Sequence, residues 1–139
     1  MAKYVVTATV VKIGTNNVSA NCASATLELT STDVDVTDFG SAGFTEVIGG
    51  LKSGTVTLDF HNDYGVGGIN TILNPLLGTI ATVTLVPNGT VVSATNPIWT
   101  APVLVNSISP IAGAVGDLAT FSVSFPTSGE VTFATAGTV

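Results

Sequence analysis

The chain has 139 residues, which suits one domain with its own core. Nine acidic residues stand against three lysines and no arginine, giving a net charge of −6. This balance excludes a nucleic-acid clamp, because phosphate binding draws its affinity from Lys and Arg. Only 9% of the residues are charged and 45% are hydrophobic, so much apolar surface must be covered by something.

Several kinds of segment are not expected in this chain. Polar residues interrupt every apolar run, and no run approaches the roughly 18 apolar residues of a membrane-spanning helix. The N-terminus leads directly into a Val- and Thr-rich segment without the pattern of a secretory signal. The single cysteine, Cys22, cannot form an intramolecular disulfide, which is typical of a protein made in a reducing cytosol.

The first half of the chain predicts strands, because Val and Thr branch at Cβ and suit a pleated sheet. The most regular alternation places Val56, Leu58 and Phe60 on one face of a strand. Between two of the strands lies a looser acidic stretch, which we interpret as an extended loop or arm. The expected order is a strand over 3–13, a loop to 24, a strand over 26–30, the looser acidic stretch over 31–43, a resumed apolar pattern over 44–48, a turn at Gly49–Gly50 and a strand over 52–60.

The second half predicts one short helix followed by further strands. Ile69, Ile72, Leu73, Leu76 and Leu77 recur with helical spacing, and Gly78 is suited to cap the helix end. Proline lacks a backbone donor, so Pro75 predicts a short helix that is kinked or split at Asn74. The expected strands lie over 79–86, a continuation at 91–93 after the turn at 87–89, then 98–108, 117–125 and 130–133. Including those before the helix, about eight strands suit a sandwich or barrel.

Candidate chemical sites in the sequence are weak. Asp59, His61 and Asp63 alternate so that they could share one strand face and hold a metal, but a strand running into a polar turn explains them better. The glycines over 65–68 lack the Lys and Ser/Thr of a phosphate-binding loop. Cys22 has no basic neighbour in sequence to activate it. We therefore predict no enzymatic activity and no metal or cofactor.

The physical character of the chain instead favours self-assembly. A β-rich monomer with few charges exposes strand edges and apolar patches that pair with other chains. Closed rings can pair these edges between neighbours, and stacking the rings can cover the remaining surface.

The sequence resembles the tail tube, or major tail, protein family of long-tailed bacteriophages over nearly its whole length. The resemblance lies in the order of its features rather than in any single motif. These features are the N-terminal Val/Thr strand, the loop over 36–40, the segment over 49–60, the Leu-rich helix, the segments over 83–89 and 96–99, the segment over 112–123 and the residues 129–132.

The resemblance implies an all-β fold with one short helix, formed by residues 1–139 as a single tail-tube-like β-sandwich domain. Such subunits are expected to form rings, hexameric in this family, whose inner sheets join into a continuous barrel. The rings would stack into a hollow tube for DNA passage, without specific DNA binding. The implied location is the virion tail after assembly in the host cytoplasm, with tape measure, tail terminator and distal tail proteins as partners.

Two groups of residues are the candidate sites. An acidic bore would repel DNA phosphates and keep the genome from adhering; the candidate lining acids are Glu28, Asp33, Asp35, Asp59 and Glu130. The resemblance also implies a loop that reaches a neighbouring subunit or ring, with candidates Asp33, Asp35, Asp38, Phe39 and Gly40. The alternatives are another β-fold virion subunit, such as a tail terminator or head decoration protein, and a monomeric β-sandwich surface-binding module.

Overall fold

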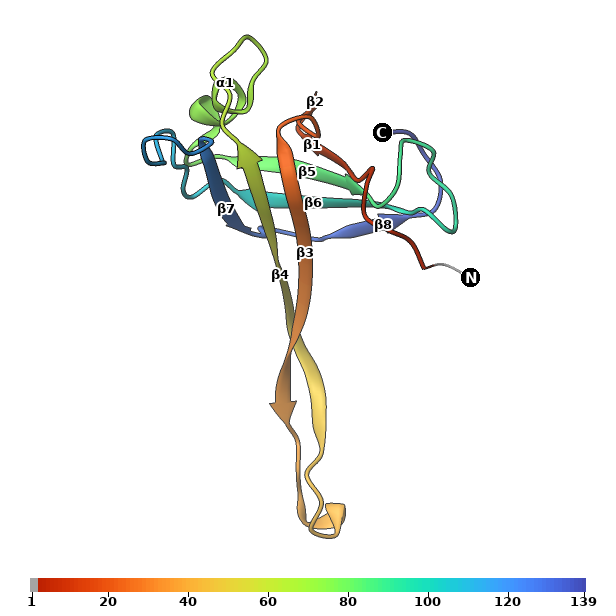
Figure 1. Cartoon of the computed structure of the whole chain (residues 1–139). Coiled ribbons are helices and arrows are strands. Elements are labelled where there is room, and N and C mark those ends of the chain that lie inside the picture. Colours follow the sequence, from red (N-terminus) through yellow and green to blue (C-terminus); the bar gives the residue numbers. More distant parts are fainter. Residues whose placement is uncertain (1–2) are drawn as a thin grey trace.

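The computed structural model describes residues 3–139 and contains two antiparallel sheets that face each other (Figure 1). The larger sheet has the strand order β2-β1-β5-β6-β8, and the smaller sheet has the order β3-β4-β7. The strands are β1 (Val10–Ile13), β2 (Asn16–Asn17), β3 (Cys22–Asp35), β4 (Val47–His61), β5 (Ile80–Val86), β6 (Ile98–Leu104), β7 (Thr120–Pro126) and β8 (Thr132–Ala134). The predicted all-β class with one short helix is confirmed.

The core lies between the two sheets and follows the period-two alternation of the strands. In β4, the side chains of Val56, Leu58 and Phe60 are buried while their neighbours face outward. β7 pairs with β4 so that Phe121 lies opposite Phe60, and their rings are 5.4 Å apart. Alternation in the sequence therefore identified the buried face of this sheet.

The helical segment covers one end of the core and is divided at the predicted residue. The α-helix α1 (Ile69–Leu73) passes into a 3-10 turn over Asn74–Leu76, because Pro75 cannot donate the next helical hydrogen bond. Ile69 and Leu73 are fully buried, whereas Leu77 is half exposed and does not belong to the buried face, contrary to the prediction. Gly78 ends the segment with a positive φ, as expected. No helix within residues 3–139 is long and apolar enough to cross a membrane.

The N-terminal strand is shorter than predicted. Only Val10–Ile13 forms β1, whereas residues 3–9 contain no strand. These residues make isolated contacts instead: the Gly89 amide donates to the Ala8 carbonyl, and the Thr9 hydroxyl donates to the Pro87 carbonyl. β-branched residues alone do not make a strand, because the backbone also needs a partner along its length.

The largest correction concerns the segment predicted as an extended loop or arm, which is mostly paired strand. β3 and β4 pair from Cys22↔Phe60 to Asp35↔Val47, with register shifts between Cys22 and Ser24 and between Ser31 and Asp33. The distal part of this pair forms a ribbon that projects far beyond the sandwich (Figure 1). Gly49 and Gly50 do not turn the chain; they lie within β4, beside a bulge in the pairing. A Cβ atom on Gly50 would collide with the Thr32 hydroxyl, so glycine permits close approach of the two strands.

Smaller differences occur near the C-terminal half. Residues 91–93 do not continue a hairpin with β5, because β5 pairs with β6 and leaves 87–97 as a long loop. The strand predicted over 98–108 ends at Leu104, and the one predicted from Asp117 begins at Thr120. β8 starts two residues later than the predicted 130. Strand existence was predicted well here, and strand ends less well.

Candidate assembly interface

The outer face of the β3-β4-β7 sheet is polar and contains no lysine. It is built by the positions that alternate with the buried core residues, since successive side chains of a strand point to opposite faces. Lys52 does not lie on this face. It pairs with Ser31, and both residues follow the same alternation as the inward-facing pair Leu27 and Val56. From the strand register, the face consists of Ser24, Thr26, Glu28, Thr30, Ser53, Thr55, Thr57, Asp59, His61, Thr120, Ser122, Ser124 and Pro126.

Two of the five predicted lining acids share this face. Glu28 lies opposite Thr55, and Asp59 lies opposite Ser24 on one side and Ser122 on the other. The Ser122 hydroxyl donates a hydrogen bond to the Asp59 carboxylate. The face thus combines hydroxyl side chains with two carboxylates and no lysine, which makes its charge negative.

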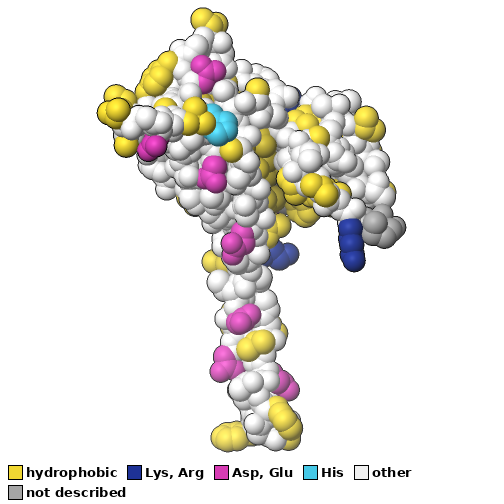
Figure 2. Space-filling view, viewed as in Figure 1, with side chains coloured by type: hydrophobic (Ala, Val, Ile, Leu, Met, Phe, Trp, Pro, Cys, Tyr) yellow, Lys and Arg dark blue, Asp and Glu magenta, His cyan; other side chains and the backbone are white. Residues whose placement is uncertain are grey.

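The other three predicted lining acids lie elsewhere. Asp33 and Asp35 are in the distal part of β3, beyond the bulge and out of the alternation of Glu28. Glu130 lies in the connection between β7 and β8, outside the three-stranded sheet. Figure 2 shows acidic side chains spread along one visible side, from the sandwich down the projecting ribbon.

Both edges of the three-stranded sheet are open. β3 and β7 are its outer strands, and neither has a further strand neighbour in this sheet among the described residues. Such edges present backbone donors and acceptors that can pair with another chain. The sheet can therefore continue into a second copy on either side.

The projecting ribbon, which we call the arm, comprises residues 31–51. Its tip is held by local hydrogen bonds: the Asp38 carboxylate accepts from the Gly40 amide at 2.9 Å, and the Asp38 amide donates to the Ser41 hydroxyl at 3.2 Å. These contacts cap a short 3-10 turn over Phe39–Ser41. The structure thus brings Asp38, Phe39 and Gly40 together at the tip, and Phe39 is fully exposed there.

Polar contacts also join the two chain segments at the base of the arm tip. The Thr37 amide donates to the Asp35 carboxylate at 2.8 Å, and the Glu46 amide donates to the Thr37 hydroxyl at 2.8 Å. Hydrogen bonds from Thr37 hold the pKa of Asp35 below its ordinary value, because they favour the charged carboxylate. The arm tip is therefore a defined surface rather than an irregular loop.

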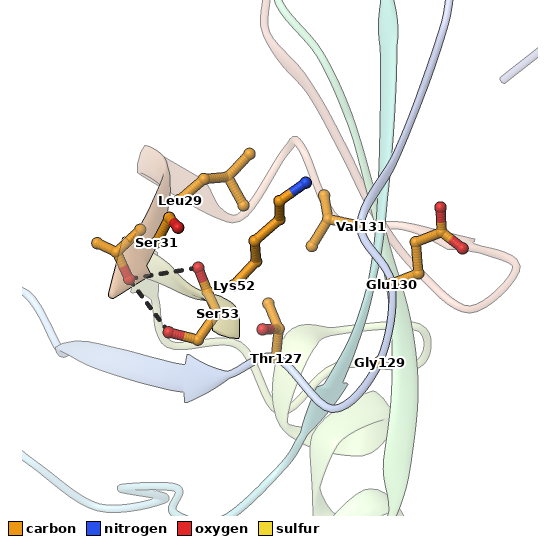
Figure 3. A pocket seen from close by; sticks show the side chains of 9 residues that line it. Leu29, Ser31, Lys52, Ser53, Thr127, Gly129, Glu130 and Val131 are labelled. Carbon is orange, nitrogen blue, oxygen red and sulfur yellow. Dashed lines mark hydrogen bonds between the residues drawn. The ribbon is translucent and has the colours of Figure 1, made fainter. Parts of the chain in front are cut away.

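A pocket of about 420 Å³ lies where the arm joins the sandwich (Figure 3). The Lys52 side chain extends between Leu29 and Val131, while Glu130 points away from it (Figure 3). The aliphatic part of Lys52 thus covers apolar surface while its ammonium stays near water. Across the adjoining strands, the hydroxyls of Thr30 and Ser53 are 3.1 Å apart. The lining side chains offer no paired base and nucleophile of the kind that catalysis needs.

The weaker chemical candidates do not converge on a site. Asp59 and Asp63 each accept hydrogen bonds from protein groups, Asp63 from the Asn21 side chain at 3.3 Å and from the Gly65 amide at 2.8 Å. Among residues 3–139, no group of three or more His, Cys, Asp or Glu side chains could hold a metal ion. Burial raises the pKa of the Cys22 thiol, which keeps it protonated and weakly reactive.

Sequence reasoning missed several exposed apolar residues. On the arm, Phe44 and Leu51 are exposed as well as Phe39. At the opposite end of the molecule, Val66, Ile111 and Val115 are exposed in loops. The available signal was a large apolar side chain flanked by glycine or other turn-forming residues, where a buried position is improbable.

Comparison with known proteins gives matches of structure only. No protein-family model matches the chain, and no curated protein matches it in sequence. A chain in the virion of a native gene transfer agent particle is similar, with a TM-score of 0.71 and 16% identity over 90% of this chain and 94% of that one. A chain in the tail of an empty gene transfer agent particle, refined with C6 helical symmetry, has a TM-score of 0.63 and 17% identity over 81% of each chain. The fold is therefore one found in gene transfer agent particles, in one case in the tail.

Proposed function

We propose that this chain is a tail tube subunit, a structural virion protein that polymerises as stacked rings around a channel for DNA. The observation that carries the proposal is the three-stranded sheet, which is open at both edges and has a polar, acidic and lysine-free outer face. Pairing of the β7 edge of one copy with the β3 edge of the next extends the sheet around a ring. The acidic face then lines the bore.

A six-fold ring is the form we propose, because a chain of similar fold belongs to a tail refined with C6 symmetry. In such a ring the outer faces of six sheets join into one barrel. Glu28 and Asp59 of each copy face the channel, where they repel the phosphates of passing DNA. The arm projects away from the sandwich (Figure 1) and, in this arrangement, towards the next ring. Tape measure, terminator and distal tail proteins are the partners we propose at the ends of the tube.

The proposal is tested by negative-stain electron microscopy of the purified protein at increasing concentration. We expect long hollow tubes. Single rings that never stack would instead indicate a tail terminator or head decoration subunit. Dispersed monomers at high concentration would overturn the proposal and leave a surface-binding module as the better assignment.

A further inference from the structure

Residues 3–9, which we call the strap, run along the open edge of β3. Two hollows lie between the strap and this edge, one of about 330 Å³ and one of about 140 Å³. Val6 and Thr9 of the strap border both hollows, and so does Ala25 of β3. The other bordering residues of these two segments are Tyr4, Thr7, Cys22, Ala23, Ser24, Leu27 and Leu29. The strap therefore lies beside the part of β3 that belongs to the sandwich.

The strap is anchored at one end only. The Gly89 amide donates to the Ala8 carbonyl at 2.8 Å, and the Thr9 hydroxyl donates to the Pro87 carbonyl at 3.0 Å. Within the described part of the chain, no backbone hydrogen bond joins positions 4–7 to β3. The side chains of Val5 and Val6 are mostly exposed and pack loosely. Lifting residues 4–7 from the edge therefore costs little free energy, as is usual for a weakly packed segment.

The strap covers the β3 edge without using the hydrogen-bonding groups of that edge. Val5, Val6 and Thr7 branch at Cβ and suit a strand. The chain nevertheless bends at Val6 and Thr7 and forms no ladder with β3. Free strand edges attract other chains, and a loop laid over an edge is one way in which proteins prevent such pairing. The bent strap thus shields the edge and leaves its backbone groups available to a later partner.

We propose that the strap blocks the β3 edge of the free subunit and is displaced when β7 of a second copy pairs there. This inference rests on the proposed ring, in which these two edges meet. Paired strands lie about 4.8 Å apart, so an incoming β7 needs the space beside β3 along which the strap runs. Displacement loses the loose packing of residues 4–7, whereas pairing gains a ladder of backbone hydrogen bonds. The strap therefore delays ring formation and does not prevent it.

The first test removes the strap. Deletion of residues 3–7 retains the anchor residues Ala8 and Thr9. It should shorten the lag before tube formation several-fold in light scattering, because the edge is uncovered from the start. Thr9→Val removes only the hydroxyl that donates to Pro87 and should shorten the lag by a smaller factor. Val5→Thr is the matched control, since Val5 borders neither hollow and its lag should equal that of the wild type.

Two results of the deletion would overturn the proposal. One is an unchanged lag. The other is a variant that unfolds in urea like the wild type but no longer assembles, because the strap would then be part of the contact between copies.

The second test holds the strap in place. In a Cys22→Ser background, Val6→Cys and Ala25→Cys put one thiol in the strap and one in β3, at two positions that border the same hollows. The dissociated subunits are oxidised and the internally linked monomer is isolated. It should stay dissociated at concentrations at which the reduced form of the same protein builds tubes, and reductant should restore assembly. Equal assembly of the linked and reduced forms would contradict the proposal, and so would failure of the link to form.

The two tests separate this inference from the proposed function. If the wild type forms tubes and neither the deletion nor the link changes their formation, the strap proposal fails and the tube remains. If neither the wild type nor the deletion variant assembles at any concentration, the proposed function fails. Assembly of the deletion variant under conditions that leave the wild type dissociated would support both.

Discussion

At the scale of single residues, glycine determines how the arm is attached to the sandwich. Gly54 pairs with Leu29 of β3, next to the position where the pairing of β7 with β4 ends. Its amide donates to the Thr127 hydroxyl at 3.0 Å, and its carbonyl accepts from the Thr127 amide at 2.9 Å. A Cβ atom here would lie 2.8 Å from the Glu28 carbonyl oxygen, which is backbone and cannot rotate away. Glycine is therefore needed at position 54 because a side chain would collide with the neighbouring strand, and not because of its φ angle.

We predict that Gly54→Ala destabilises the isolated subunit by about 1–3 kcal/mol, because the added methyl group must displace strand backbone. The matched control is Gly49→Ala in the same strand, whose Cβ would meet only the Ser31 hydroxyl at 3.3 Å. Urea unfolding below the concentration for assembly measures both free energies of unfolding. Equal stability of the two variants would contradict this account of Gly54.

At the scale of elements, β4 is one strand with two different environments. Its C-terminal half is packed between β3 and β7 and buries three large side chains in the core. Its N-terminal half pairs with β3 alone, in the two-stranded arm. A two-stranded hairpin is only marginally stable in water, since it buries little on either face. In the dissociated subunit we therefore expect the arm to be only marginally stable.

Hydrogen exchange should reveal this division within the single strand β4. In dissociated subunits, amides over 47–53 should exchange far faster than those over 55–61, because local opening of the arm costs little free energy. In assembled material the arm amides should become protected, while the amides over 55–61 change little. Slow exchange throughout β4 in the dissociated subunit would show that the arm is stable by itself.

The sequence predicted the elements that alternation or a single proline defines. Val56, Leu58 and Phe60 identified a core strand, and Pro75 located the division of the helix. It did not predict that Gly49 and Gly50 lie within a strand, since the same glycines would also suit a turn. Whether these glycines form a turn or a strand depends on the close approach of Thr32 across the ribbon. Thr32 is distant in sequence, so a local pattern does not reveal this contact.

The acids of the outer face were predicted only in part, because contacts between residues distant in sequence also decide which side chains share this face. Sequence spacing gave Asp59 an outward direction, but it could not show that Glu28 shares its face, because that follows from the register of β3 on β4. Glu130 looked equivalent in sequence and lies outside the sheet. Which strands are neighbours, and in which register, is decided by packing over the whole chain.

At the scale of the whole molecule, the acidic and basic side chains are distributed unevenly over the two faces of the three-stranded sheet. The bore-facing side proposed here carries Glu28 and Asp59 and no lysine, while Lys52 lies on the inward alternation. In the proposed ring this arrangement would repeat around the channel, so the negative potentials of weakly charged subunits would add up along the tube. A charge change on this face should thus alter DNA passage more than the same change elsewhere.

This difference can be measured with tubes assembled from single-residue variants. Glu28→Lys and Glu130→Lys change the net charge of the chain equally, but only Glu28 lies on the outer face of the three-stranded sheet. We expect Glu28→Lys tubes to retain a short DNA duplex in co-sedimentation at low salt, with retention falling steeply as salt rises, because retention then depends on lysine–phosphate contacts. Wild-type tubes should retain none, and Glu130→Lys tubes should retain little. Equal retention by the two variants would mean that the outer face of this sheet does not line the channel.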